Sequence, residues 1–413
     1  MYQLRCFFVV VVLLLGVQSA VSARPFMTAE LEGQWYVFST EVNMAAQTMG
    51  WTYGEFEMNG NGEVLSGNHT DAQGNVSTFS GGRMTLDQRG VARGVINMEM
   101  PDTTKAVMTA VHGKIDHTGT TGAYIGMTAT EAAPEIPVAL CLTNTFKAGG
   151  SFTQADLQGE WHAMSTVMDV AGGVFWIHGT FTVDGAGNVS AAPDSYHNPL
   201  GKPATVTGGF LNLDAEGRLI GAIGFTFEDP DTPGNNISIN SQLVAGKMDE
   251  EKSSAAYVAR DLDTDAPNNL RYLEVVYLAK AGGDFTAADN VGNWMGYVLT
   301  IETATREVFP MRGEFYIDAE GNTGGAWISP DGTVSRITGG TTQIDENGVS
   351  TGTMPLSTGE TITIVKGKMD MGKTRGMAVS LSDNNMMLVG LNFKDTYRFP
   401  WPAFLPGIIG GGR

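Results

Sequence analysis

Two acidic segments near the middle of the chain carry the residues best suited to bind a cation. Their carboxylates are Glu228, Asp229, Asp231, Asp261, Asp263 and Asp265. Calcium prefers carboxylate and amide oxygens as ligands. The two segments come to the same end of the molecule if the strands around them run up and down in sequence. Calcium is therefore a possible cofactor of this region, although we favour the simpler interpretation that these acidic loops are well solvated.

The residue sets that catalysis or transition-metal binding needs are otherwise missing. The chain has 6 histidines and 2 cysteines, and none forms a His-x-x-x-His or Cys-x-x-Cys pair. No glycine-rich phosphate loop precedes a helical pattern, and no set of Ser, His and Asp recurs at matched positions. The sequence therefore predicts a protein that is not an enzyme and that has no cofactor apart from calcium.

Aromatic side chains recur on one face of a predicted strand. Trp51 and Tyr53 share a face, because strand residues alternate between faces, and Phe56 lies on the other. Trp176 and His178 repeat this pattern further along the chain. One face lines a core, and the other contacts a neighbouring domain, a ligand or a partner. Trp51, Tyr53, Trp176 and His178 are therefore our candidate ligand-binding residues.

Four sequence landmarks recur in the same order three times. The first is Gly-x-Trp, at Trp35, Trp161 and Trp294. The others are Gly-x-Phe, Gly-Gly followed by an apolar residue and Asp, and Gly-Lys-x-Asp, which begin at Gly54, Gly179 and Gly313, at Gly81, Gly208 and Gly339, and at Gly113, Gly246 and Gly367. An ordered repeat of this kind identifies the structural module. The Lys and Asp of the last landmark could form a charged ladder or a ligand clamp, and we favour the structural role.

The repeat fixes the predicted domain boundaries. Nearly identical heptapeptides, Lys147–Thr153 and Lys280–Thr286, mark the joints. We predict a signal peptide at 1–23, barrel repeats at 24–146, 147–279 and 280–396, and a tail rich in proline and aromatic residues at 397–413. The joints are short, so we expect the copies to abut closely.

Within each copy, about eight short segments rich in β-branched and aromatic residues alternate with turns. Turns such as Asp214-Ala215-Glu216-Gly217 are typical of hairpins. Sequential hairpins give an antiparallel meander, and eight such strands can close into a barrel. The fold prediction is all-β: three tandem meander barrels, each with tight turns at one end and longer loops at an open end suited to binding.

The short helical turn followed by Gly-x-Trp resembles the opening of lipocalins, and the length of the unit is similar to that of avidin-type barrels. The resemblance implies that Trp35, Trp161 and Trp294 lie at the barrel floor and that a small apolar ligand enters at the open end. A lipocalin-type disulfide is missing. The basic residues that could cover the Trp are Arg271 and Arg398.

A formal net charge of -19 disfavours nucleic acid as a partner. After removal of the signal we expect no membrane span and a secreted protein, periplasmic or extracellular if bacterial. The predicted function is a non-enzymatic binding protein for a small apolar ligand or a surface partner protein. A structural or adhesive surface protein is the alternative, and one outer-membrane β-barrel of roughly 24 strands is a third reading.

Overall fold

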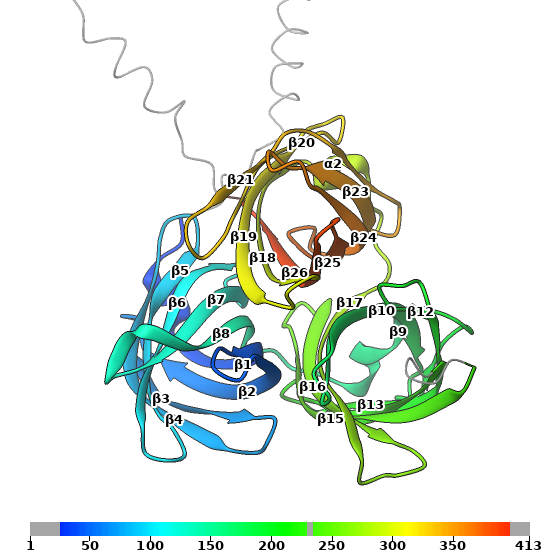
Figure 1. Ribbon diagram of the computed structural model, residues 1–413, viewed down its shortest axis with the longest axis horizontal. Coiled ribbons are helices and arrows are strands. Elements are labelled where there is room, and N and C mark those ends of the chain that lie inside the picture. The colour runs from blue at the N-terminus through cyan, green and yellow to red at the C-terminus, as the bar shows by residue number, and fades with distance from the viewer. Residues whose placement is uncertain (1–24, 229–233, 397–413) are drawn as a thin grey trace, which may run out of the picture. The chain divides into compact units, whose positions relative to one another are not determined.

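The computed structural model describes residues 25–228 and 234–396. The predicted signal peptide (1–23) and the C-terminal tail (397–413) therefore lie outside the described residues. Within the described ranges the chain is built almost entirely of antiparallel strands, which group into three sheets (Figure 1).

The first copy is a closed eight-stranded barrel in meander order. The short 3-10 turn η1 (Thr28–Leu31) precedes it, and β1 pairs with both β2 and β8 to close the ring. Its strands are β1 (Gly33–Asn43), β2 (Thr48–Met58), β3 (Val64–Asp71), β4 (Val76–Leu86), β5 (Val91–Glu99), β6 (Lys105–Ile115), β7 (Thr121–Thr130) and β8 (Ala133–Lys147).

The second copy follows η2 (Gln154–Leu157) and also closes, because β9 pairs with both β10 and β17. Two fragments, β11 and β12, stand in place of a full third strand. The strands are β9 (Gly159–Asp169), β10 (Val174–Val183), β11 (Val189–Ser190), β12 (Tyr196–His197), β13 (Pro203–Leu213), β14 (Leu219–Glu228), β15 (Asn236–Met248), β16 (Ser254–Asp263) and β17 (Leu270–Lys280).

The third copy follows α2 (Ala287–Asn290) and forms a nine-stranded sheet whose order ends at β21 and β22. Gly339 and Gly340 separate these two short strands, at the position where β4 of the first copy continues through Gly81 and Gly82. The strands are β18 (Gly292–Glu302), β19 (Val308–Ile317), β20 (Thr323–Ile328), β21 (Val334–Ile337), β22 (Thr341–Ile344), β23 (Val349–Pro355), β24 (Thr361–Met369), β25 (Arg375–Leu381) and β26 (Asn385–Lys394).

The prediction of three tandem meander units is thus confirmed, with two closed barrels and a third sheet that remains open in its strand order. The reading of all strands as one barrel of roughly 24 strands is wrong, because β8, β17 and β26 each return to the first strand of their own copy. Each copy completes its own sheet before the chain enters the next copy.

The tight turns at the closed ends are held by their aspartates. Asp214 Oδ1 accepts backbone hydrogen bonds from Glu216 (3.0 Å) and Arg218 (2.8 Å). Gly217 adopts a φ of 78°, which glycine reaches without steric cost. Asp87 and Asp345 accept the same pair of bonds in the other two copies. The repeated Asp-x-x-Gly pattern therefore encodes the same hairpin three times.

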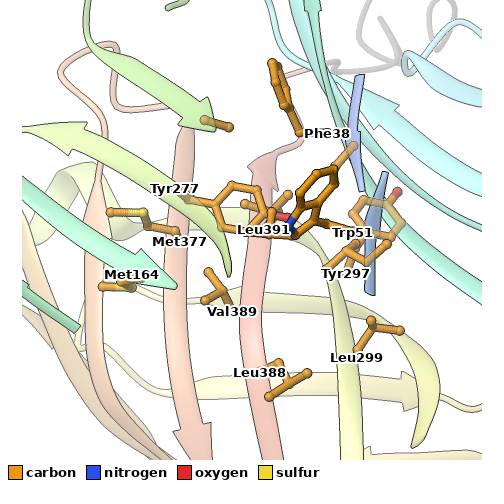
Figure 2. Packing of buried hydrophobic residues seen from close by; sticks show 14 of the residues in the cluster. Phe38, Trp51, Met164, Tyr277, Tyr297, Leu299, Met377, Leu388, Val389 and Leu391 are labelled. Atoms are coloured by element: carbon orange, nitrogen blue, oxygen red, sulfur yellow. The ribbon is translucent and has the colours of Figure 1, made fainter. Parts of the chain in front are cut away.

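Each barrel has its own apolar core, and a fourth apolar cluster joins the three copies (Figure 2). The outer faces of the first two and last two strands of each copy supply it, for example Phe38, Met164 and Tyr297. Trp51 Nε1 donates a hydrogen bond to Ala259 O at 2.9 Å, linking the first copy to the second. The copies therefore abut closely, through a shared core rather than through linkers alone.

The aspartates of the Gly-Lys-x-Asp landmark meet between the copies. Arg375 Nε lies 2.9 Å from Asp370 Oδ2 and 3.6 Å from Asp116 Oδ2, and Arg375 Nη2 contacts Asp249 Oδ2. All four side chains are nearly completely buried. Glu251, which is partly exposed, lies 3.1 Å from Arg375 Nη2. One guanidinium thus pairs with the matching aspartate of every copy, which gives this landmark a structural role.

Candidate ligand cavity of the second barrel

The second barrel contains a cavity of about 450 Å³. Cavities of about 80 Å³ and about 10 Å³ lie inside the third and first copies. A volume of a few hundred Å³ or more is typical of small-molecule sites. The second barrel is therefore the copy with room for an organic ligand.

Apolar and aromatic side chains form the cavity wall. They come from five strands and comprise Val167, Phe175, Ile177, Phe225, Phe227, Ile239 and Tyr272. Tyr272 lies between two of these rings, with centroids 6.0 Å from Phe175 and 6.1 Å from Phe227. Such edge and tilted packing gives the wall a fixed shape with a mainly apolar surface.

The mouth of the cavity lies at the end with longer connections. The turn between β12 and β13 contributes Leu200, which is 84% exposed although it lines the cavity. Lys202 Nζ pairs with Glu228 Oε2 at 2.9 Å, joining this turn to the end of β14. The exposed Leu200 side chain and the Lys202–Glu228 ion pair therefore flank the opening of the cavity.

The closed end of the barrel is plugged. Trp161 is fully buried, and its Nε1 donates to Leu157 O at the end of η2 (2.7 Å). Lys280 Nζ lies 5.5 Å from the Trp161 ring centroid and donates to Asp156 O at 2.8 Å. Lys147 and Lys394 stand in the same relation to Trp35 and Trp294. All three predicted floor tryptophans thus lie in their own barrel cores under a lysine.

Sequence reasoning missed these covering lysines. It considered Arg271, which lies 3.5 Å from Asp263, and Arg398, which is outside the described residues. The signal was present, because Lys147 and Lys280 begin the two repeated heptapeptides. The two joints therefore also supply the cation that covers the floor of the barrel just completed.

Two carboxyl groups lie deep in the cavity of the second barrel. Asp261 is completely buried and Glu274 is 3% exposed, and both line the cavity. Burial raises the pKa of Asp261 to about 7. Burial and the neighbouring Asp261 carboxyl raise the pKa of Glu274 well above its usual value. The pair therefore tends to hold a proton instead of carrying two charges.

The six carboxylates predicted to bind calcium are not all brought together. Asp229 and Asp231 lie outside the described residues, Asp261 points into the barrel, and Glu228 pairs with Lys202 at the mouth. Asp263 accepts the backbone N–H of the exposed Asp265 at 2.9 Å. In the part of the chain that the structure describes, no group of three or more His, Cys, Asp or Glu side chains is placed to hold a metal ion. Calcium binding by the full set stays a prediction.

The four predicted ligand-binding residues lie on the outsides of their barrels. Trp51 and Trp176 are buried in the cluster shared by the three copies. Tyr53 packs beside Trp51, with ring centroids 5.9 Å apart, and His178 stacks on Trp176 at 5.6 Å. None of these residues lines the cavity of the second barrel. This outer face therefore contacts the neighbouring copies, which is one of the three roles that the sequence left open for it.

Glu274 is the functional candidate that sequence reasoning overlooked. It stands alone as a charged residue within the apolar run from Tyr272 to Ala279 on β17. A charge inside such a run is unusual, because buried carboxylates are costly without a partner. A single carboxylate within an apolar strand is therefore the sequence feature that distinguishes Glu274 from the acids of the loops.

No protein-family model matches this chain, and no curated protein matches it. Among solved structures, transferrin-binding protein B from Haemophilus parasuis Hp5 is 9% identical, covering 87% of this chain and 75% of that chain with a TM-score of 0.26. Intact Ap-TbpB, with N and C lobes, is 10% identical over 90% of this chain and 77% of that chain, with a TM-score of 0.25.

A DUF3598-family protein of unknown function from Nostoc punctiforme PCC 73102 is 11% identical over 61% of this chain and 96% of that chain, with a TM-score of 0.18. Scores this low transfer neither a family nor a function. Within residues 25–228 and 234–396, no helix has the length and apolar character needed to cross a bilayer.

Proposed function

We propose that this protein is an exported, non-enzymatic binding protein whose second barrel holds a small, mainly apolar molecule. The observation that carries the proposal is the cavity of about 450 Å³ with its aromatic wall. Small-molecule sites are commonly pre-formed, mostly apolar hollows with a few polar groups. The barrel meets this description, with a plugged floor, an open mouth and two carboxyl groups inside.

Export rests on the N-terminal apolar run from Phe7 to Leu15 followed by small residues, which is typical of a secretory signal. The other two copies act as supports in this proposal. Their interiors are largely filled, and their outer faces complete the apolar cluster against which β9, β10, β16 and β17 pack.

A cavity-filling variant tests the binding proposal. Ala204 lines the cavity on β13, opposite Phe227 on β14, so Ala204→Phe places a ring in the hollow. We expect the affinity for 1-octanol, measured by displacement of a fluorescent apolar probe, to fall at least about tenfold. Ile220→Phe is the matched control, because Ile220 is 58% exposed on the neighbouring strand β14.

The control should bind octanol as the unsubstituted protein does. Native mass spectrometry of protein purified without detergent should also show a molecule that organic extraction removes. If octanol does not bind, or binds both variants equally, the cavity is not a ligand site. An empty protein that associates with itself would support the structural or adhesive alternative.

A further inference from the structure

The two carboxyl groups that line the cavity lie on adjacent strands. Asp261 on β16 lies opposite Tyr272 on β17, and Glu274 lies opposite Ala259, so the two acids are diagonal neighbours on the inner face. Neither carboxylate oxygen of Asp261 has a fully formed hydrogen bond, although the Ser241 hydroxyl and the Glu274 carboxyl lie near enough to interact with it. A completely buried acceptor facing a cavity is rarely left unused in proteins.

Within residues 25–228 and 234–396, no cation influences the pKa of Asp261 or Glu274. Ser241 on β15 lies opposite Asp261, and the phenols of Tyr257 and Tyr196 are close enough for the Glu274 charge to affect their pKa, which burial raises first. Among the described residues that line the cavity, Lys202 is the one cation, and it is bound to Glu228 at the mouth. A ligand group with hydrogen-bond donors and a positive charge would complement the remaining negative charge of the pair.

On the basis of the proposed function, we propose that the second barrel selects an apolar amine, whose ammonium group binds between Asp261 and Glu274. An ammonium group has three donors and one positive charge, so it supplies hydrogen bonds to both carboxyls and balances the one negative charge that remains when the pair holds a proton. The aromatic wall accommodates the apolar part, and its ring faces favour a nearby cation. An amphiphile ending in a carboxylate would bring a third acid to the pair and be disfavoured.

The first barrel shows that this acid pair is not a requirement of the fold. Met108 lies opposite Thr128 in the register in which Ser241 lies opposite Asp261. Counting from the lysines that pair with Trp35 and Trp161, Cys141 takes the place of Glu274. The first barrel thus closes with Thr128 and Cys141 at these positions, and its cavity is only about 10 Å³. The acid pair therefore occurs in the second barrel, which has the large cavity, and is absent from these positions in the first barrel.

Three probes with one chain length test the inference: octylamine, 1-octanol and octanoate. Their affinities are measured by probe displacement and calorimetry at pH 7 on the full chain, on Asp261→Asn and on Glu274→Gln. We expect octylamine to bind at least about tenfold more tightly than octanol, and octanoate to bind most weakly. Either substitution should remove most of the amine preference while octanol binding persists.

Different results would contradict apolar binding by the second barrel and amine selection by the acid pair. If octanol binds but octylamine binds no better, or if the preference survives in both variants, selection by the acid pair is wrong and the binding proposal stands. If none of the probes binds the unsubstituted protein, both are wrong. Since the comparison of probes is made first on the unsubstituted protein, a variant that fails to fold does not decide the result.

Discussion

The first and second barrels close their floors with the same kinds of residue, yet their interiors differ. Phe79 packs edge-on against Phe56 (ring centroids 6.1 Å apart) and against His69 (5.4 Å) inside the first barrel. Counting from the Gly-Gly landmark, the second barrel has Val206 at the position of Phe79. The same framework therefore becomes packed or hollow through side-chain volume.

The third strand is the second difference. In the first barrel β3 is a continuous strand of 8 residues, whereas the second barrel has two fragments of 2 residues each, β11 and β12. The turn that follows β12 supplies Leu200 and Lys202 to the cavity mouth. A shortened strand thus opens the wall, while the closed end and the shared outer cluster stay as in the other copies. Function can diverge there because stability is provided elsewhere.

The largest expected effect is on the free energy of unfolding, when one phenylalanine in each of the two barrels is replaced by alanine. Phe79 in the first barrel and Phe225 in the second are 5% and 6% exposed, but Phe225 borders the cavity. We expect Phe79→Ala to lower the free energy of unfolding by about 4 kcal/mol, because it empties a packed interior. Phe225→Ala should cost at least about 1 kcal/mol less, since one side of that ring already lacks contacts. Guanidinium denaturation measures both.

The two substitutions also differ in their effect on ligand binding. Phe225→Ala should weaken octanol binding, whereas Phe79→Ala should leave the second barrel's affinity unchanged in the folded protein. Equal stability losses from the two variants would show that the second barrel is not hollow in solution, and the contrast between the barrels would be lost.

The next effect concerns the ion cluster that holds the barrels together. Arg375→Met leaves Asp116, Asp249 and Asp370 buried without their shared cation, so we expect a loss of about 3 kcal/mol in the free energy of unfolding. Arg312→Met is the control, because the pair of Arg312 with Glu314 is partly exposed and should be worth less than about 1 kcal/mol. Similar small losses in both would mean that solvent reaches the cluster.

The asymmetry of this cluster also shows what could be predicted from the sequence. Each copy supplies its landmark aspartate, for which the sequence favours a structural role over a ligand clamp because the residue also begins a turn. The arginine comes from the third copy only, five positions after Asp370, where the other copies have Thr121 and Ser254. The strands, hairpins and floor tryptophans can be predicted because each recurs in every copy. Arg375 occurs once, so the repeat gives no indication of its role.

The candidate site was harder to predict for the same reason. The calcium prediction places Asp261 at the start of a connection between strands, but β16 continues to Asp263, and Asp261 lines the cavity. Residues inside a strand point alternately to its two faces, so a boundary placed three residues too early assigns a buried, inward-facing residue to an exposed loop. The volume of the cavity depends on packing among side chains from β9, β10 and β13 to β17, and no local pattern encodes it.

The smallest effect is a dependence of stability on pH. The pKa of Asp261 is raised from 3.8 to about 7, mainly by burial, so the folded protein binds this proton more tightly than the unfolded chain does. The resulting stability is complete below about pH 4 and is lost as the pH rises through about 7. Asp261→Asn should therefore lose less stability between pH 5 and pH 8 than the unsubstituted protein, by on the order of 2 kcal/mol.

The first barrel provides the matched control for this prediction. Burial and then the charge of Asp71 raise the pKa of Glu41 to about 7, so Glu41→Gln should flatten the same pH range. The two barrels differ in what restores stability at pH 8. Saturating octylamine should stabilise Glu41→Gln as it does the unsubstituted protein, because ligands stabilise the state that binds them. It should stabilise Asp261→Asn less, because that variant keeps only the apolar contacts with the ligand, and equal rescue of both variants would place the amine elsewhere than on the acid pair.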